Sequence, residues 1–256
     1  MSITEAFGAA VMSGAVKTID LTHTLDPDFP VLVLPEQFGQ CAPFRIEEVS
    51  RYDDRGPAWY WRNFSCNEHT GTHFDAPVHW VTGKDLPNAS VDTLSPDGFV
   101  RPACVLDFSA EAKADPDFIL TADHIKAWEK AHGAIPRGWW ALFRTDWSKR
   151  AWKDYLNLKE DGAHSPGPDA GAIRHLLTRD VVGFGVETIG TDAGRGGGFD
   201  PPYPAHTLLH GAGKFGLQCL AHLDQLPPRG ALIIAPPLKI KQGSGSPLRV
   251  LAMVER

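Results

Sequence analysis

The sequence predicts an α/β domain built on a mixed β-sheet, and three observations support this fold class. Five short apolar runs have the character of buried strands. Two segments between them combine helical spacing of apolar residues with residues that begin helices, and strands that alternate with helices are typical of α/β domains. The 25 glycines and 21 prolines are spread along all 256 residues rather than gathered into a linker. We therefore expect a single domain over residues 1–256.

The predicted strands and helices alternate along the second half of the chain. Strands are expected at 103–108, 139–144, 181–186, 231–234 and 249–254. The helix expected at 121–131 begins at Thr121, since threonine is favoured at the N-cap. The helix expected at 168–178 begins at Pro168, because proline is favoured in the first helical turn. A third helix is expected at 206–220, although its three glycines weaken the pattern.

Composition and charge exclude several classes of function. The net charge of −6 disfavours nucleic acid as a partner, because phosphate binding needs a basic surface. No apolar run approaches the roughly 20 residues that a membrane span requires. The four cysteines are widely spaced and form no C-x-x-C pair, which favours a reducing compartment. The first residues lack the basic and apolar pattern of a signal peptide, so we expect a cytoplasmic protein.

Residues 69–79 carry the strongest functional signal in the chain. They read His-Thr-Gly-Thr-His-Phe-Asp-Ala-Pro-Val-His and hold three of the eleven histidines. Imidazole nitrogen and carboxylate oxygen are ligands of divalent transition metals. We therefore predict a metal site in this segment, rather than a polar loop whose side chains bond only to one another.

A metal site requires this segment to bend. In a straight strand the first and last histidines would be separated by ten residues, about 33 Å, which is too far for one ion. Gly71 permits a tight bend with positive φ, and Pro77 fixes φ and removes a donor from any strand ladder. We expect a bent strand or loop, in which the outer histidine, His79, can lie off the metal.

The motif has the form H-x-G-T-H-x-D-x-P-x-H, and several other segments accompany it. These are residues 20–25, Arg144-Thr145-Asp146, Tyr203-Pro204-Ala205-His206 and Gln218. With these features the chain resembles the cyclase family of metal-dependent hydrolases across most of its length. The resemblance implies the swivelling β/β/α fold of that family, with a mixed central sheet, and a homo-oligomer, either a dimer or larger.

The resemblance also assigns roles within the motif. His69, His73 and Asp75 correspond to metal ligands of the family, and His79 corresponds to its catalytic acid–base. The ordinary histidine pKa of about 6.5 suits a group that takes up and returns a proton near neutral pH. A fourth metal ligand, or a group that orients the ligands, is the alternative role for His79.

Gln218 sets this chain apart from the formamidases of the family. Those members hold a second metal with a later histidine and with a glutamate twelve residues beyond it, positions that correspond here to His206 and Gln218. Two adjacent dications repel each other and need an anionic ligand between them. With a neutral glutamine we expect one divalent metal per chain, bound by His69, His73, Asp75 and the amide oxygen of Gln218. Such a nitrogen–oxygen shell favours Mn²⁺, with Zn²⁺ as the alternative.

The glutamine also indicates the reaction. By resemblance it points to the members of the family that open the cyclic amide isatin to isatinate, with a metal-activated water as nucleophile and His79 as general base. Hydrolysis of N-formylkynurenine is the alternative reaction. A non-catalytic binder with a structural metal is a third interpretation, disfavoured because structural sites are closed by protein ligands.

The substrate expected for this reaction is a small aromatic cyclic amide. Aromatic residues flank the motif and could bind it. Strand alternation places Trp59 and Trp61 on one face, and we expect one of them, together with Trp80, to stack against the substrate. His206 is expected to line the same pocket. No nucleic-acid or membrane partner is expected.

Overall fold

A mixed sheet organises the protein, and the computed structural model describes residues 1–80, 82–84 and 86–256. Within this described part, nine strands form one sheet in the order β1-β15-β13-β5-β7-β11-β12-β4-β14. Strands β5, β7, β11 and β12 are parallel to one another, and antiparallel strands extend the sheet on both sides. The predicted mixed sheet is therefore present.

The strands of this sheet are β1 (Val16–Asp20), β4 (His73–Asp75), β5 (Val100–Asp107), β7 (Trp140–Arg144), β11 (Gly183–Val186), β12 (Phe215–Gln218), β13 (Arg229–Ile234), β14 (Gly245–Pro247) and β15 (Leu251–Glu255). Three separate pairs are β2 (Arg45–Arg51) with β3 (Tyr60–Ser65), β6 (Ile119–Leu120) with β10 (Gly167–Pro168), and β8 (Leu158–Lys159) with β9 (Gly162–Ala163). The helices are α1 (Ile3–Met12), α2 (Ser109–Ala114), α3 (Ala122–His132) and α4 (Ala170–Thr178). All five predicted strands are present, with ends shifted by a few residues.

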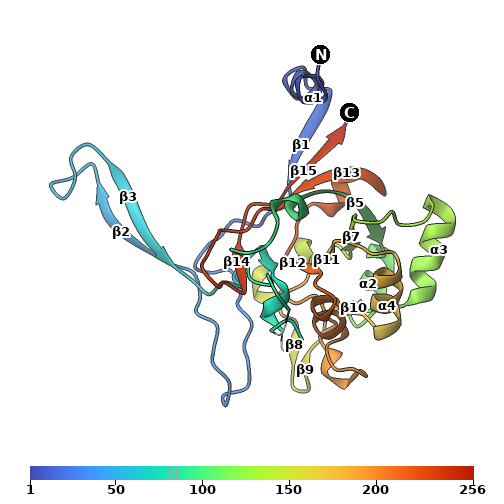
Figure 1. Ribbon diagram of the computed structural model, residues 1–256. Coiled ribbons are helices and arrows are strands. Elements are labelled where there is room, and N and C mark those ends of the chain that lie inside the picture. Colours follow the sequence, from blue (N-terminus) through green and yellow to red (C-terminus); the bar gives the residue numbers. More distant parts are fainter. Residues whose placement is uncertain (81, 85) are drawn as a thin grey trace.

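The parallel strands are apolar because both of their faces are buried. Side chains alternate along β7, so that Trp140 and Leu142 join one apolar cluster while Ala141 and Phe143 join another on the opposite face. Helices α3 and α4 cover the second cluster, and Figure 1 shows α2, α3 and α4 together beside the sheet. This packing explains why continuous apolar runs predicted these strands correctly.

The two predicted helices are present, with one change of boundary. Helix α3 begins after Thr121, whose hydroxyl accepts a hydrogen bond from the His124 amide, as the sequence predicts. Helix α4 begins two residues later than predicted, because Asp169 is its N-cap and accepts from the Ala172 amide at 2.7 Å. Pro168 belongs to strand β10 instead.

The third predicted helix, 206–220, is wrong over most of its length. A short π-helix covers Ala205–His210, and the chain then turns at Gly213, where φ is +72°. The following residues form strand β12, whose side chains are buried between β11 and β4. The glycines end the helix, and pairing with distant strands determines the conformation of the rest.

The hairpin of β2 and β3 extends away from the rest of the protein (Figure 1). Among the described residues these two strands pair only with each other, and every residue of β3 is exposed. An isolated two-stranded hairpin is marginally stable in water. None of the described helices is long and apolar enough to cross a lipid bilayer.

Candidate active site

The segment 69–79 bends as the sequence predicts. Gly71 adopts a φ of +65°, in the left-handed region that glycine tolerates best. The chain then forms the short strand β4 and a 3₁₀ turn over Pro77–His79, which Pro77 begins. These two bends bring the outer histidines of the motif back towards its centre.

Strand β4 lies between β12 and β14, and its register gathers the site. His73 is opposite Gln218 on β12, while Asp75 is opposite Gly216 on β12 and Gly245 on β14. A Cβ atom at Gly216 would lie 2.8 Å from Asp75 Oδ2, and one at Gly245 would lie 2.5 Å from His69 Cε1. Glycine on both neighbouring strands therefore leaves the space that the aspartate and histidine side chains occupy.

Asp75 is the centre of the cluster and is fully buried. Its Oδ1 lies 2.9 Å from His69 Nδ1 and 3.4 Å from His73 Nε2. Burial favours the neutral acid, but the imidazoles of His73 and His69 beside the carboxylate hold the pKa of Asp75 well below its usual range. Asp75 therefore provides a buried negative charge, which is what a metal cation requires.

The ring nitrogen of His73 that lies near Asp75 is unprotonated and unpaired among the described residues. Its Nδ1 lies 2.8 Å from the Gly71 carbonyl oxygen, which can only accept, so Nδ1 carries the proton. The unprotonated Nε2 is buried and has no hydrogen-bond partner among the described residues. A buried acceptor without a donor is costly, and a bound metal ion would remove that cost. The residues present thus fit a divalent metal.

Gln218 lies against Asp75. Its side-chain nitrogen donates to Asp75 Oδ2, and its oxygen accepts from the Gly190 amide at 2.6 Å. The opposite orientation of the amide would place two donors together at Gly190 and two acceptors together at Asp75. In this orientation the side-chain nitrogen, rather than the oxygen, faces Asp75, so a metal shared by Asp75 and the Gln218 oxygen requires the amide to rotate.

His79 lies beside the cluster, with its ring 3.8 Å from that of His69. Ligand atoms of His69, Asp75 and His79 all lie within 4.8 Å of one another. Burial, which outweighs the attraction of Asp75, and the neighbouring histidines lower the pKa of His79 to about 2. This direction differs from the ordinary histidine pKa expected from the sequence, because the ring is buried. His79 is consequently neutral at pH 7, and a neutral imidazole has one unprotonated nitrogen that can accept a hydrogen bond.

His206 is held by Asp192, a residue that the sequence did not single out. Asp192 Oδ2 lies 2.5 Å from His206 Nδ1, and the same carboxylate accepts the backbone amides of Ala205 and His206. Although burial opposes it, this hydrogen bond raises the pKa of His206. Ligand atoms of Asp75, His206 and His210 also lie within 4.8 Å of one another. The structure therefore brings His206 to the site, as predicted.

Trp80 is the predicted tryptophan that the structure brings to this site. Its ring centroid lies 4.7 Å from that of His206 and 6.3 Å from that of His79. Its indole nitrogen donates to Thr207 Oγ1 at 3.2 Å, which fixes the ring against the π-helix. An aromatic wall thus stands next to the two histidines.

Trp59 and Trp61 are not brought to the site of their own chain. Trp61 lies on β3 and Trp59 directly precedes that strand, and their side chains are 58% and 45% exposed. Both belong to the projecting hairpin of Figure 1. Strand alternation correctly placed the two rings near each other, 5.9 Å apart, but local sequence could not predict where the hairpin points.

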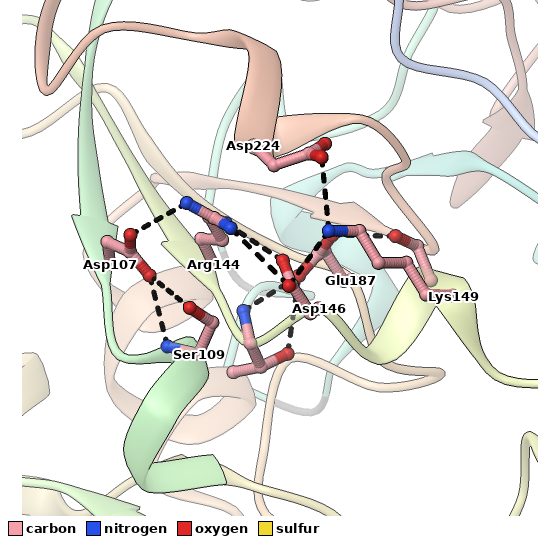
Figure 2. Close-up of polar contacts among 9 residues, drawn as sticks. Asp107, Ser109, Arg144, Asp146, Lys149, Glu187 and Asp224 are labelled. Carbon is pink, nitrogen blue, oxygen red and sulfur yellow. Dashed lines mark hydrogen bonds and ion pairs between the residues drawn. The ribbon is translucent and has the colours of Figure 1, made fainter. Parts of the chain in front are cut away.

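A polar network lies at the carboxyl ends of β5, β7 and β11 (Figure 2). Arg144, at the end of β7, bridges Asp107 and Asp146 at 2.7 and 2.8 Å. Buried Glu187 follows β11 and accepts from the Thr145 amide at 2.7 Å. The loop that begins at Glu187 carries Gly190 and Asp192, which contact Gln218 and His206. The Arg144-Thr145-Asp146 segment therefore supports the site from outside it.

This geometry defines a class of protein. An unpaired imidazole lone pair, a buried carboxylate and a neutral histidine beside them are the arrangement expected of a metal-dependent hydrolase. Comparison with known families identifies the family within this class. It belongs to the cyclase family, since the family model described as putative cyclase matches residues 19–193.

Individual relatives match the whole chain. The isatin hydrolase of Roseibium aggregatum is 50% identical over 258 residues, covering 100% of this chain and 98% of that protein. The solved structure of isatin hydrolase A from Labrenzia aggregata bound to benzyl benzoate is 62% identical, with a TM-score of 0.98 and 100% of both chains covered. An isatin hydrolase bound to the product analogue thioisatinate is 49% identical, with the same TM-score and coverage. These matches confirm the predicted family and fold.

Proposed function

We propose that this protein hydrolyses isatin, opening its cyclic amide to isatinate. The observation that carries the proposal is the cluster around Asp75, in which glutamine occupies position 218 beside the carboxylate. Similarity to isatin hydrolases over the full chain supports the same reaction. We also propose that residues 1–256 form a single domain, which the pairing of β1 with β15 supports.

The proposed metal site holds one divalent ion per chain. Its protein ligands are His69, His73, Asp75 and the oxygen of Gln218. Only one of these four is anionic, so the site offers too little negative charge for two dications. Mixed imidazole, carboxylate and amide ligands favour Mn²⁺, with Zn²⁺ as the alternative.

When bound, such an ion supplies Lewis acidity, which lowers the pKa of a bound water and polarises the amide carbonyl. His79, which lies beside the ring of His69, takes the proton of the attacking water on its unprotonated ring nitrogen. It then returns that proton to the ring nitrogen of isatin as the C–N bond breaks, which yields an aromatic amine and a carboxylic acid that loses its remaining proton to solvent. Trp80 stacks against the fused rings, and His206, held by Asp192, donates to a substrate oxygen.

The test of this function compares isatin with N-formylkynurenine, the substrate of the alternative reaction. Protein stripped of metal and reloaded with Mn²⁺ or Zn²⁺ is mixed with each compound, and its loss is followed by absorbance. We expect metal-dependent loss of isatin and little loss of the formamide. A preference for N-formylkynurenine would mean that Gln218 does not determine the reaction.

Replacing Gln218 by glutamate is expected to raise the metal content from one towards two ions per chain. The new carboxylate would lie next to Asp75 and supply the negative charge that a second dication needs. Elemental analysis of the purified variant measures the ratio. Gln225→Glu adds the same charge at an exposed position and serves as the control. An unchanged ratio in Gln218→Glu would show that this residue does not control the number of metals.

The projecting hairpin supports the proposal of a homo-oligomer, in the simplest case a homodimer. It exposes Trp59, Trp61 and Phe64, and its base lines a groove of about 650 Å³ together with Leu238 and Leu248. A second copy of the chain that packs on this hairpin would cover the aromatic rings and bring Trp59 or Trp61 to a substrate pocket.

Trp61→Ala is accordingly expected to weaken the oligomer by roughly 2–4 kcal/mol, the cost of removing a central aromatic contact. The ring is exposed within its own chain, so the melting temperature of the isolated subunit should not fall. Sedimentation velocity over a concentration series measures the dissociation constant. Leu158→Ala, at an exposed apolar residue of another hairpin, is the control. A dissociation constant equal to that of the unaltered protein would show that Trp61 does not lie in the interface.

We also propose a cytoplasmic location. Cys41, Cys66, Cys104 and Cys219 form no disulfide in the described part of the chain. Free thiols are typical of reducing compartments.

A further inference from the structure

We propose that Glu68 and Ser244 are positioning residues for the metal, which fix His69 so that its Nδ1, and not its Nε2, is the ligand atom. The inference rests on the proposed metal-dependent function, and it concerns two residues outside the predicted ligand set. They are far apart in sequence, and they meet on the side of His69 that faces away from Asp75.

A chain of short hydrogen bonds connects these residues. Glu68 Oε2 accepts from both the backbone amide and the hydroxyl of Ser244, at 3.0 and 2.6 Å. The Ser244 hydroxyl oxygen lies 2.9 Å from His69 Nε2. On the other side of the ring, His69 Nδ1 lies 2.9 Å from Asp75 Oδ1. Each ring nitrogen of His69 therefore has an oxygen atom 2.9 Å away.

The direction of these bonds determines where the protons lie. Glu68 accepts two hydrogen bonds from Ser244, so the hydroxyl proton points to the carboxylate. The hydroxyl oxygen then accepts, and His69 Nε2 must donate to it. In a neutral imidazole this leaves the lone pair on Nδ1, which faces an oxygen of Asp75. Two lone pairs 2.9 Å apart repel unless a cation lies between or beside them, so this arrangement suits a shared metal ion.

The backbone leaves Ser244 little freedom to move away. Its carbonyl oxygen accepts from the Ala76 amide at 2.9 Å, directly after β4. Gly243 and Gly245 lie on either side, where a Cβ atom would meet Glu68 Oε1 at 3.1 Å and His69 Cε1 at 2.5 Å. The segment from Gly243 to Gly245 thus fits closely over the ring and the glutamate.

The two histidine ligands consequently use different nitrogens. His73 donates from Nδ1 to a backbone carbonyl and offers Nε2, whereas His69 donates from Nε2 and offers Nδ1. Outer partners that fix the ring and the tautomer of a ligand strengthen metal binding, and their loss lowers affinity about 10- to 100-fold.

The first test measures metal affinity without substrate, so its outcome does not depend on the reaction. Ser244→Ala and Glu68→Gln are stripped of metal, and their Zn²⁺ and Mn²⁺ affinities are determined by competition with a chelator. We expect about 10- to 100-fold weaker binding in Ser244→Ala and a smaller loss in Glu68→Gln. Ser109→Ala breaks a similar hydroxyl–carboxylate pair, at 2.7 Å from Asp107, away from the site, and should bind metal as the unaltered protein does. Affinities within twofold of the control for both variants would overturn the proposal.

The second test reads the tautomer directly in the unaltered sequence, so it does not depend on variants that fold. Protein with ¹⁵N-labelled histidine is loaded with diamagnetic Zn²⁺, and long-range ¹H–¹⁵N spectra are recorded and assigned in the unaltered protein. We expect protonated Nε2 and metal-bound Nδ1 in His69, and the opposite pattern in His73. A protonated Nδ1 in His69 would contradict the assignment, whether or not the protein hydrolyses isatin.

Discussion

Replacing His79 by alanine is expected to lower kcat for isatin hydrolysis by about 10²–10⁴-fold while the metal content stays at one ion per chain. This range is the usual contribution of a general acid–base. His79 is neutral because burial lowers its pKa, and it lies next to the ring of His69 without being one of the proposed ligands. The variant should therefore lose proton transfer and retain the metal.

Steady-state rates and elemental analysis on the same preparation separate the possible roles of His79. His132→Ala, which removes an exposed histidine at the end of α3, controls for loss of an imidazole in general. If His79→Ala loses its metal, His79 is a ligand, as its place within 4.8 Å of His69 and Asp75 allows. If the variant retains both metal and activity, the acid–base assignment is wrong.

Asp75→Asn is expected to abolish metal binding at micromolar concentrations and to lower activity by roughly 10³-fold or more, since a catalytic metal contributes several kcal/mol to the barrier. Asp75 is the one anionic group among the four proposed ligands, and it is fully buried. Asparagine keeps the shape of the side chain but removes the charge that attracts the cation.

The measurement is metal content after equilibration with one equivalent of Mn²⁺, followed by the rate of isatin loss. Asp123→Asn removes a charge that is 89% exposed on α3, and it should leave both quantities unchanged. Full metal content in Asp75→Asn would show that the imidazoles and Gln218 suffice to bind the ion. The central place given to this carboxylate would then be incorrect.

Local sequence predicted the parts of the fold that local forces determine. The strands β5, β7 and β11 follow from apolar runs that are buried on both faces, and α3 follows from its cap at Thr121. Residues 215–218 were assigned to a helix because their pairing partner, β4, lies about 140 positions away in the sequence. Local spacing carries no information about such a partner.

The sequence likewise identified some residues of the candidate site and missed others. The motif 69–79 and Gln218 could be identified from the residues and from resemblance to the family. The partners that hold these groups could not be identified, because Ser244 contacts Glu68 across 176 positions, and Asp192 lies in a loop without a recognisable pattern. The low pKa of His79 could not be predicted from the sequence either, because the rings around it come from separate parts of the chain.

The most direct test of a single-metal hydrolase is titration of metal-free protein with Mn²⁺ while isatin hydrolysis is followed by absorbance. We expect no activity without metal, a linear rise in rate with added Mn²⁺, and a plateau at one equivalent per chain. A plateau at two equivalents, or hydrolysis by the metal-free protein, would contradict this expectation.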